Sequence, residues 1–298
     1  MHAKSQVLIA RLVSLVELRA LQNPFWRRVI LVGAALGFVI GIVLSIRAQP
    51  QVIYNLQWLP VLWLVALTIP ATIALNAWEF VLSARLIGHH IEFRSALETT
   101  IIGGVANMLP LPGGIMVRVA ALKAAGASLK HGMSTTLFVA WIWFGVAFAY
   151  AGAWMMTLGA TNAGAVFLVS GIVILLISFT ATMRLLKKWR VTMHLTVIKL
   201  GLVLIDAARV YLSLWALSSS SSFGQASVLT ASSVVGSAIS IVPAGIGIRE
   251  GVAALMGPLV GLAASSAFLA TSLNRLFGLA TTAPVAAFLA FQKSDTSA

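Results

Sequence analysis

The sequence predicts an all-α, polytopic membrane protein with about six full spans and two broken, re-entrant helical hairpins in an inverted-topology repeat. Three observations predict this fold class. Of the 298 residues, 60% are apolar and 9% are charged, whereas a soluble domain carries roughly 25% charged residues. Several apolar runs reach the roughly 20 residues that cross a bilayer. A pattern of Pro, Gly and Arg that interrupts one apolar segment also recurs 133 residues further along the chain.

Six apolar runs are long enough to be spans, and they cover residues 29–46, 58–82, 133–158, 164–181, 197–217 and 264–291. Two further apolar stretches are short and end in a Pro/Gly break, after which another short piece follows. The first of these broken pairs covers 95–109 and continues to about 125, and the second covers 226–242 and continues to about 260. We therefore expect an interfacial helix, a first repeat, a second inverted repeat and a cytoplasmic tail, over 1–28, 29–160, 161–291 and 292–298.

Basic residues lie mainly in alternate loops. With the N-terminus inside, the inner segments hold sixteen Lys and Arg residues and the outer segments hold only Arg47. This positive-inside bias predicts that both termini are cytoplasmic. The expected location is the cytoplasmic membrane of a bacterium. The net charge of +13 is then a matter of topology and contact with anionic lipids, not of nucleic-acid binding.

The two halves of the chain align at a fixed offset of 133 residues. Gly103, Pro110 and Gly114 fall on glycine, proline and glycine of the second half, and "VAAL" at 119–122 falls on "VAAL" at 252–255. Each half contains two spans, a hairpin and a third span, so it makes an odd number of crossings whether the hairpin is re-entrant or fully spanning. The second half must therefore be inverted, as in many secondary transporters.

The breaks predict a site for an anion. Backbone groups freed at a break cannot face lipid, so they must lie inside protein or line a watery cavity. Free helix N-termini also attract anions. The candidate substrate-binding residues are Pro110, Gly113, Gly114, Arg118, Pro243, Gly245, Gly247, Arg249, Glu250 and Arg275. The alternative is that both breaks are packing kinks and that Arg118 extends to the headgroups.

Charged residues within apolar runs need partners or water. Asp206 and Arg209, three residues apart on one helix face, are expected to pair with each other. Glu250 needs a different partner, for which Arg275 and Arg118 are candidates. Glu79, Asp206 and Arg209 form either a coupling site for a proton or a permanent ion pair.

Several chemistries are excluded or disfavoured. The chain has no cysteine, which removes thiolate nucleophiles and cysteine metal sites. Its five histidines show no metal-binding spacing, so we expect neither a metal nor a cofactor. The acidic residues are scattered over separate spans, which argues against an enzyme.

The breaks also resemble a known family. "MLPLPGGIMVRVAALKAAGAS" and "SIVPAGIGIREGVAALM" are similar to the two signatures of the transmembrane region of bacterial lysylphosphatidylglycerol synthetase/flippase, over about 30–290. Pro243, Gly245, Gly247, Arg249 and Glu250 match its P-x-G-x-G-x-R-E pattern, and Arg275 matches the arginine of the following span.

The first signature departs from the family pattern. Ile115 stands where the family has Glu, although Arg118 is kept, and "FVAWIWFG" lacks the Arg and Asp of the family's next span. The resemblance implies movement of a lipid headgroup across the bilayer. It does not imply lipid synthesis, since no soluble transferase domain is present in this sequence.

We therefore expect a lipid transporter or flippase that moves an amphiphile with an anionic headgroup through a cavity between the paired hairpins. Its partners would be membrane lipids, with a homo-oligomer possible. The alternatives are a secondary transporter for a small soluble anion and a non-transporting membrane scaffold. The identity of the lipid, the direction, the coupling ion and the oligomeric state stay open at this stage.

Overall fold

A computed structural model of the chain describes residues 24–107, 113–185, 188–238 and 245–295, and this part is all-helical. The apolar runs of the sequence therefore form helices, as predicted, and several of these helices are long. Residues 1–23 of the expected interfacial helix over 1–28 lie outside the described residues. From Pro24 onward the chain already belongs to the first long helix.

Long helices lie at all six predicted spans, and they are α3 (Pro24–Ala48), the second span, α9 (Leu129–Thr157), α10 (Thr161–Leu185), α11 (Trp189–Ala216) and α14 (Ala264–Asp295). Among the described residues, four helices are long and apolar enough to cross a membrane on length and composition, and these cover 58–86, 129–157, 161–184 and 189–216. A short turn of helix, α4 (Gln51–Tyr54), follows α3. The last helix runs beyond the predicted end at 291, to Asp295.

The second span is locally distorted. It consists of α5 (Trp58–Trp63), a π-helical turn η1 (Leu64–Thr68) and α6 (Ile69–Leu86). Pro70 lies at the start of α6, and proline cannot donate a backbone hydrogen bond and clashes with the carbonyl four residues earlier. A wider turn just before Pro70 accommodates this ring, and π turns of this kind are frequent at functional sites.

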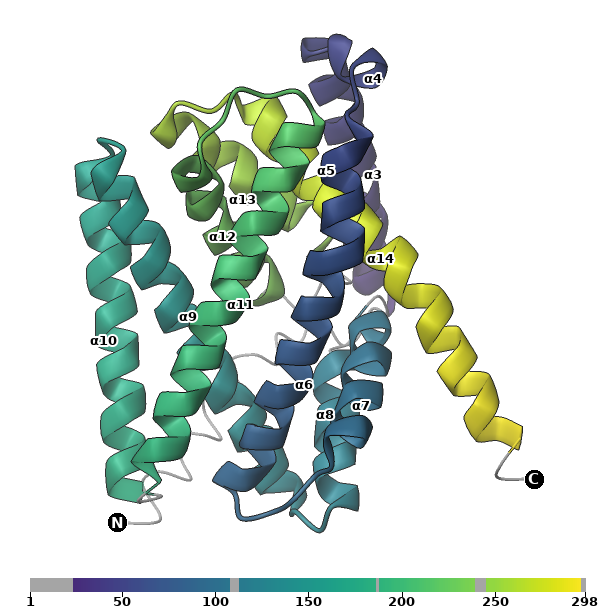
Figure 1. Ribbon diagram of the computed structural model, residues 1–298, viewed down its shortest axis with the longest axis vertical. Helices are drawn as coiled ribbons and strands as arrows, with labels where there is room; N and C mark the ends of the chain where they lie inside the picture. Colours follow the sequence, from purple (N-terminus) through teal and green to yellow (C-terminus); the bar gives the residue numbers. More distant parts are fainter. Residues whose placement is uncertain (1–23, 108–112, 186–187, 239–244, 296–298) are drawn as a thin grey trace.

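Two pairs of short helices flank the predicted breaks. They are α7 (Phe93–Ala106) with α8 (Gly113–Ala124), and α12 (Phe223–Ala238) with α13 (Ile248–Met256). A 3-10 turn, η3 (Gly257–Val260), extends α13. Figure 1 shows α7 and α8 in the lower half of the molecule and α12 and α13 in the upper half. Pro110 and Pro243, at the centres of the two breaks, lie outside the described residues.

Glycines bring the two helices of each pair into backbone contact. A Cβ at Gly113 would overlap the carbonyl of Ala106, and a Cβ at Gly245 would overlap the carbonyl of Gly236. Gly245 also has φ +63°, a left-handed conformation that only glycine adopts readily. Gly236 and Gly245 therefore fix how closely the upper pair packs around its break.

The remaining helices form the scaffold around these pairs. In Figure 1, α9 and α10 form an antiparallel arm on one side. Their backbones touch because a Cβ at Gly152 would come within 2.8 Å of Leu168 Cα, and Gly171 makes a similar approach to Ala149. A buried core cluster joins α9, α11, α12, α13 and α14, with Leu214, Leu229 and Ala270 among its fully or nearly fully buried members.

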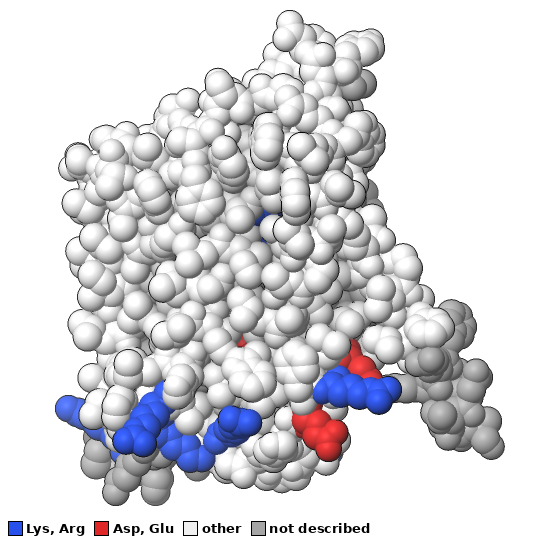
Figure 2. Space-filling model, in the orientation of Figure 1, with Lys and Arg blue, Asp and Glu red and all other residues white. Residues whose placement is uncertain are grey.

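Exposed charge is concentrated at one end of the molecule. On the face seen in Figure 2, the Lys and Arg side chains gather along the lower edge. The loops at that end join α6 to α7, α8 to α9 and α10 to α11, and their neighbourhoods carry the exposed residues Arg85, Arg94, Lys123, Lys130, Arg184 and Arg190. The distribution defines a basic end and an end that is nearly free of basic residues on this face.

Candidate functional site

The lower cluster consists of Glu79 on α6, Arg118 on α8 and Lys199 on α11. Glu79 is fully buried, and its two carboxylate oxygens have different partners. Arg118 Nη1 donates to Oε1 at 3.0 Å and Lys199 Nζ donates to Oε2 at 2.8 Å. One carboxylate therefore serves two cations, one from the hairpin and one from a long helix.

Aromatic rings complete the surroundings of these two cations. The guanidinium carbon of Arg118 lies 5.7 Å from the centre of the Phe80 ring, and Lys199 Nζ lies 5.5 Å from that of Trp143. Ring faces at these distances attract cations. The Arg118 side chain remains 22% exposed while that of Lys199 is 6% exposed, so Arg118 is the cation of this cluster that an incoming group can reach.

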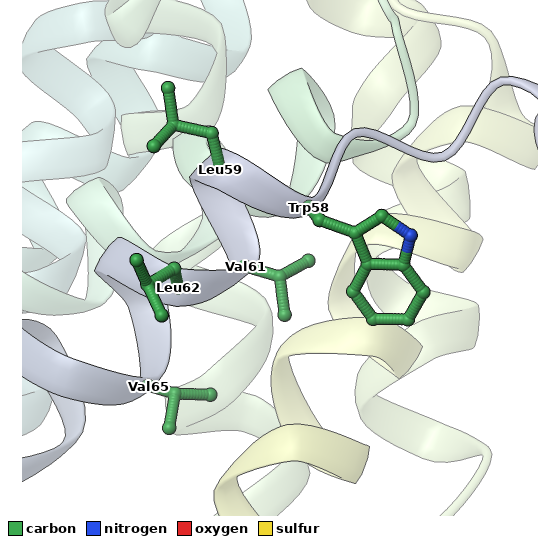
Figure 3. A pocket seen from close by; sticks show the side chains of 5 residues that line it. All are labelled: Trp58, Leu59, Val61, Leu62 and Val65. Atoms are coloured by element: carbon green, nitrogen blue, oxygen red, sulfur yellow. The ribbon is translucent and has the colours of Figure 1, made fainter.

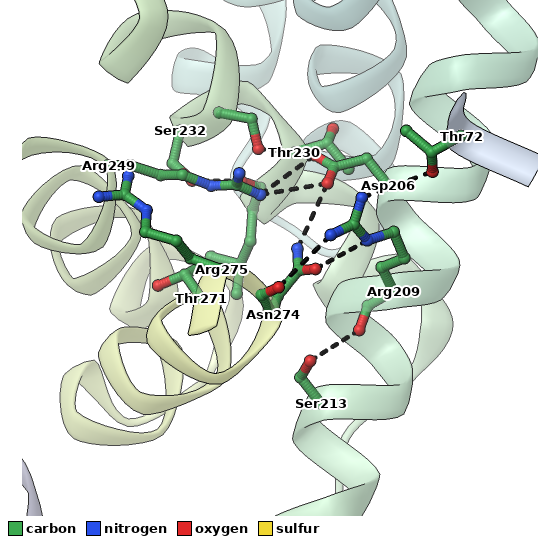
Figure 4. Close-up of polar contacts among 12 residues, drawn as sticks. Thr72, Asp206, Arg209, Ser213, Thr230, Ser232, Arg249, Thr271, Asn274 and Arg275 are labelled. Carbon is green, nitrogen blue, oxygen red and sulfur yellow. Dashed lines mark hydrogen bonds and ion pairs between the residues drawn. The ribbon is translucent and has the colours of Figure 1, made fainter. Parts of the chain in front are cut away.

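The upper cluster is built from α11, α12, α13 and α14 (Figure 4). Arg249 Nη2 on α13 donates to Asp206 Oδ1 on α11 at 3.1 Å. Asp206 also accepts hydrogen bonds from Ser233 Oγ at 2.6 Å and from Asn274 Nδ2 at 3.4 Å. Arg209 Nε donates to Asn274 Oδ1 at 2.8 Å, so the Asn274 amide links Arg209 to Asp206.

A second ion pair stands beside the first. Arg275 Nε on α14 lies 3.2 Å from Glu250 Oε1 on α13. The other oxygen of Glu250 accepts the N–H of Gly247 at 2.9 Å, and Arg275 Nη2 donates to the carbonyl of Gly245 at 3.2 Å. Glu250 and Arg275 thus tie α14 to the glycines that end the upper break.

Two buried donors of the upper cluster make no hydrogen bond within the described part of the chain. They are Arg249 Nε and Arg275 Nη1, whereas Glu250 Oε1 has the Arg275 guanidinium as its ion-pair partner. An unsatisfied buried polar atom costs roughly 1–3 kcal/mol. Both atoms are donors on arginines, so the cluster retains hydrogen-bonding capacity for an anionic oxygen.

One N–H at the start of each helix that follows a break already has a side-chain partner. Gly114 N on α8 donates to Asn107 Oδ1 at 2.8 Å, and Gly247 N at the start of α13 donates to Glu250. The sequence-based view that such N–H groups await a bound anion does not hold for these two. An anion would instead meet the arginine side chains.

The structure changes some of the predicted pairings. The spacing predicts a pair between Asp206 and Arg209, but Asp206 pairs with Arg249 instead, because the guanidinium of Arg209 donates to Asn274 on α14. Of the two candidates for Glu250, Arg275 is the partner. Arg118 binds Glu79 instead.

Three contributing residues are absent from the predicted site. Lys199 follows a basic loop in the sequence but is only 5% exposed, and its seven-residue spacing from Asp206 is the signal that puts both on one face of α11. Asn274 and Ser233 carry no charge, so a pattern of charges within apolar runs does not include them.

Each cluster has an excess of one formal positive charge. The lower cluster has two cations and one carboxylate, and the upper cluster has Arg209, Arg249 and Arg275 against Asp206 and Glu250. A net charge within apolar helices is costly unless water or a counterion compensates it. Both clusters therefore favour an anion. Within the described residues, no group of three or more His, Asp and Glu side chains could hold a metal ion.

Two hollows lie at the upper end, away from both clusters. One, of about 530 Å³, is apolar and lined by Trp58, Leu59, Val61, Leu62 and Val65 (Figure 3). The other has a similar volume and lies between the segments 48–55, 217–220 and 261–266. Its polar lining is uncharged and includes Gln49, Asn55, Ser218 and Ser266. Neither contains a group that recognises a phosphate by charge.

Long apolar helices that enclose charged clusters define an all-helical membrane protein. The chain belongs to the family described as the lysylphosphatidylglycerol synthase TM region, whose pattern matches residues 30–286. This membership suggests a membrane protein related to lipid handling. No curated protein and no solved structure matches the chain.

Proposed function

We propose that the protein is a lipid transporter or flippase that moves an amphiphile with an anionic headgroup across the bacterial cytoplasmic membrane. The observation that carries the proposal is the pair of buried clusters, each with one net positive charge and one partly exposed hairpin arginine. Family membership supports the choice of a lipid as the amphiphile. The apolar tails would stay in the bilayer while the headgroup passes the clusters.

The proposed orientation places the basic end of the molecule in the cytoplasm. The basic loops beside α7, α8, α10 and α11 (Figure 2) support this orientation through the positive-inside rule. With six spans and two hairpins, both termini would then be cytoplasmic. The lower cluster would lie on the cytoplasmic side and the upper cluster on the outer side.

We propose that the two hairpins are re-entrant and that the halves are inverted repeats. Support comes from the 133-residue offset in the sequence and from the positions of the two helix pairs in opposite halves of Figure 1. The ion pairs follow the same plan, because each hairpin arginine binds a carboxylate of the second long helix in its own half. The partners are 39 residues apart in the first half and 43 in the second.

This arrangement supports exchange of partners at each cluster. A headgroup phosphate can draw Arg118 away from Glu79 without stranding the carboxylate, because Lys199 still binds it. In the upper cluster, Asp206 keeps Ser233 and the Asn274–Arg209 link when Arg249 turns to the headgroup. In this proposal the carboxylates bind the arginines by ion pairs while no headgroup is present, and no enzymatic reaction is proposed for them.

Reconstitution into liposomes tests the proposal. Liposomes containing phosphatidylglycerol with a fluorescent NBD headgroup or tail label report movement between leaflets, because dithionite quenches only the outer leaflet. The wild type is expected to make the inner-leaflet label accessible, and Arg118→Gln and Arg249→Gln are each expected to slow this at least tenfold. A wild type that moves no labelled lipid contradicts the proposal.

A transporter of a small soluble anion is the second candidate. The net positive charge of the clusters supports it equally, and uptake of a soluble anion such as phosphate into the same liposomes, without lipid movement, would favour it. A membrane scaffold would tolerate neutralisation of both hairpin arginines.

A further inference from the structure

A row of polar side chains on α6 connects the two clusters. Thr72, Asn76 and Glu79 lie four and three residues apart, which places them on one helix face. Thr72 Oγ1 accepts a hydrogen bond from Arg209 Nη1 at 3.4 Å (Figure 4), so the upper end of the row touches the upper cluster. Its lower end is Glu79 of the lower cluster.

The distances along the helices agree with this connection. A helix rises about 1.5 Å per residue, so Thr72 and Glu79 are about 10 Å apart along α6. On the neighbouring helix α11, Lys199 contacts Glu79 and Arg209 contacts Thr72. The two helices thus run antiparallel, with Glu79 beside Lys199 and Thr72 beside Arg209. Asn76 lies between these two contacts along α6.

Asn76 is accessible and has spare hydrogen-bonding capacity. It is half-buried, like Thr72, whereas Glu79 is fully buried. One N–H of its Nδ2 donates to the Thr72 carbonyl at 2.9 Å, and within the described residues the second N–H and Oδ1 have no partner. A carboxamide in this state is unfavourable against lipid tails, so the face that carries it needs water or a polar visitor.

We propose that Thr72 and Asn76 form an intermediate binding station for an anionic, phosphate-type headgroup on its way between the two clusters. The second N–H of the Asn76 amide donates to a headgroup oxygen, and the Thr72 hydroxyl, whose hydrogen goes to the Thr68 carbonyl, accepts from Arg209 and so holds that guanidinium at the upper end of the row. A step of about 10 Å between two arginine-bearing clusters is thereby divided into two shorter ones. This inference rests on the proposed transport function and assigns it a path.

The test compares transport and binding in Asn76 variants. In liposomes with NBD-labelled phosphatidylglycerol, Asn76→Leu is expected to slow lipid movement at least tenfold, because leucine matches asparagine in size and lacks donors. Asn76→Gln keeps the amide and is expected to stay within threefold of the wild type. Phosphatidylglycerol retained by the purified protein, measured by native mass spectrometry, is expected to be equal in all three, because both clusters are intact.

A threonine pair provides the matched control. Thr72→Val is expected to slow movement about threefold or more. Thr136→Val on α9 removes a hydroxyl that, like that of Thr72, is half-buried and bonds the carbonyl four residues earlier, and it is expected to leave the rate unchanged. If Asn76→Leu does not fold, Thr72→Val with this control decides the question.

The outcomes separate the station from the function itself. A wild type that moves the labelled lipid, together with Asn76→Leu and Thr72→Val at the same rate, overturns the station and leaves the proposed function standing. Equal slowing by Asn76→Leu and Asn76→Gln, or loss of retained lipid in Asn76→Leu, also overturns it. A wild type that moves no labelled lipid overturns both.

Discussion

Replacement of Glu79 by glutamine removes the carboxylate that Arg118 and Lys199 share, with almost no change in side-chain size. Each contact is close, at 3.0 and 2.8 Å. At an effective dielectric constant of about 20, an attraction at this distance is about 6 kcal/mol. Much of it offsets the cost of removing the three charges from water, and that cost remains for both cations in the variant.

Loss of one partner of a buried ion pair is therefore expected to lower the free energy of unfolding by about 3–5 kcal/mol. The measurement is unfolding by titration with SDS in mixed micelles, followed by circular dichroism. The matched control is Glu98→Gln, which weakens an Arg94–Glu98 pair at 3.7 Å whose arginine side chain is 90% exposed. An exposed pair contributes roughly 0.2–1 kcal/mol.

A second substitution tests whether charge is the cause. Lys199→Met in the Glu79→Gln background restores the formal charge of the lower cluster to one and leaves only Arg118, which is 22% exposed. The double variant is expected to recover at least about 2 kcal/mol relative to Glu79→Gln, a coupling typical of residues in contact. A loss below about 1 kcal/mol in Glu79→Gln, or no recovery in the double variant, would refute the reasoning.

Three further predictions concern the upper cluster, measured by the same titration. Arg249→Gln is expected to cost less stability than Glu79→Gln, because Asp206 keeps its hydrogen bonds from Ser233 and Asn274; an equal loss would contradict this. Gly245→Ala is expected to cost at least about 1–3 kcal/mol through overlap, whereas Gly251→Ala, where a Cβ meets nothing within 4 Å, is expected to be neutral or stabilising. Glu250→Gln keeps an acceptor for the Gly247 N–H but leaves Arg275 buried without its carboxylate, and is expected to cost about 3–5 kcal/mol; wild-type stability would show that this pair contributes little.

The positions of the helices could be predicted from the sequence because bilayer thickness and backbone chemistry set them. An apolar run of about 20 residues becomes a span, and each of the six predicted runs lies within a long helical segment, to within one residue at its end. The hairpin helices were located for a related reason, since a Pro/Gly break ends a helix in lipid as it does in water. Gly113 is the first residue of α8. Gly245 lies against the carbonyl of Gly236 on α12, just before α13 begins.

The pairing of charges could not be predicted in the same way. Spacing along one helix suggested Asp206 with Arg209, but a contact three residues away contributes only a few tenths of a kcal/mol. Residues from other helices determine the pairing. Arg249 of α13 brings a guanidinium to Asp206, and Asn274 of α14 brings an amide to Arg209. Lys199 was missed since a lysine near a basic loop looks like a headgroup contact until its burial is known.

The long helix α11 supplies charged residues to both clusters. It supplies the second cation of the lower cluster, Lys199, and both Asp206 and Arg209 of the upper cluster. The hairpin helices α8 and α13 each supply one arginine to only one cluster. Because helices resist stretching, a displacement of α11 along its axis cannot alter one cluster without altering the other. In the proposed transport cycle, a headgroup that takes Arg118 from Glu79 would therefore change the forces on the helix that holds Asp206, and α11 would connect the two sides physically.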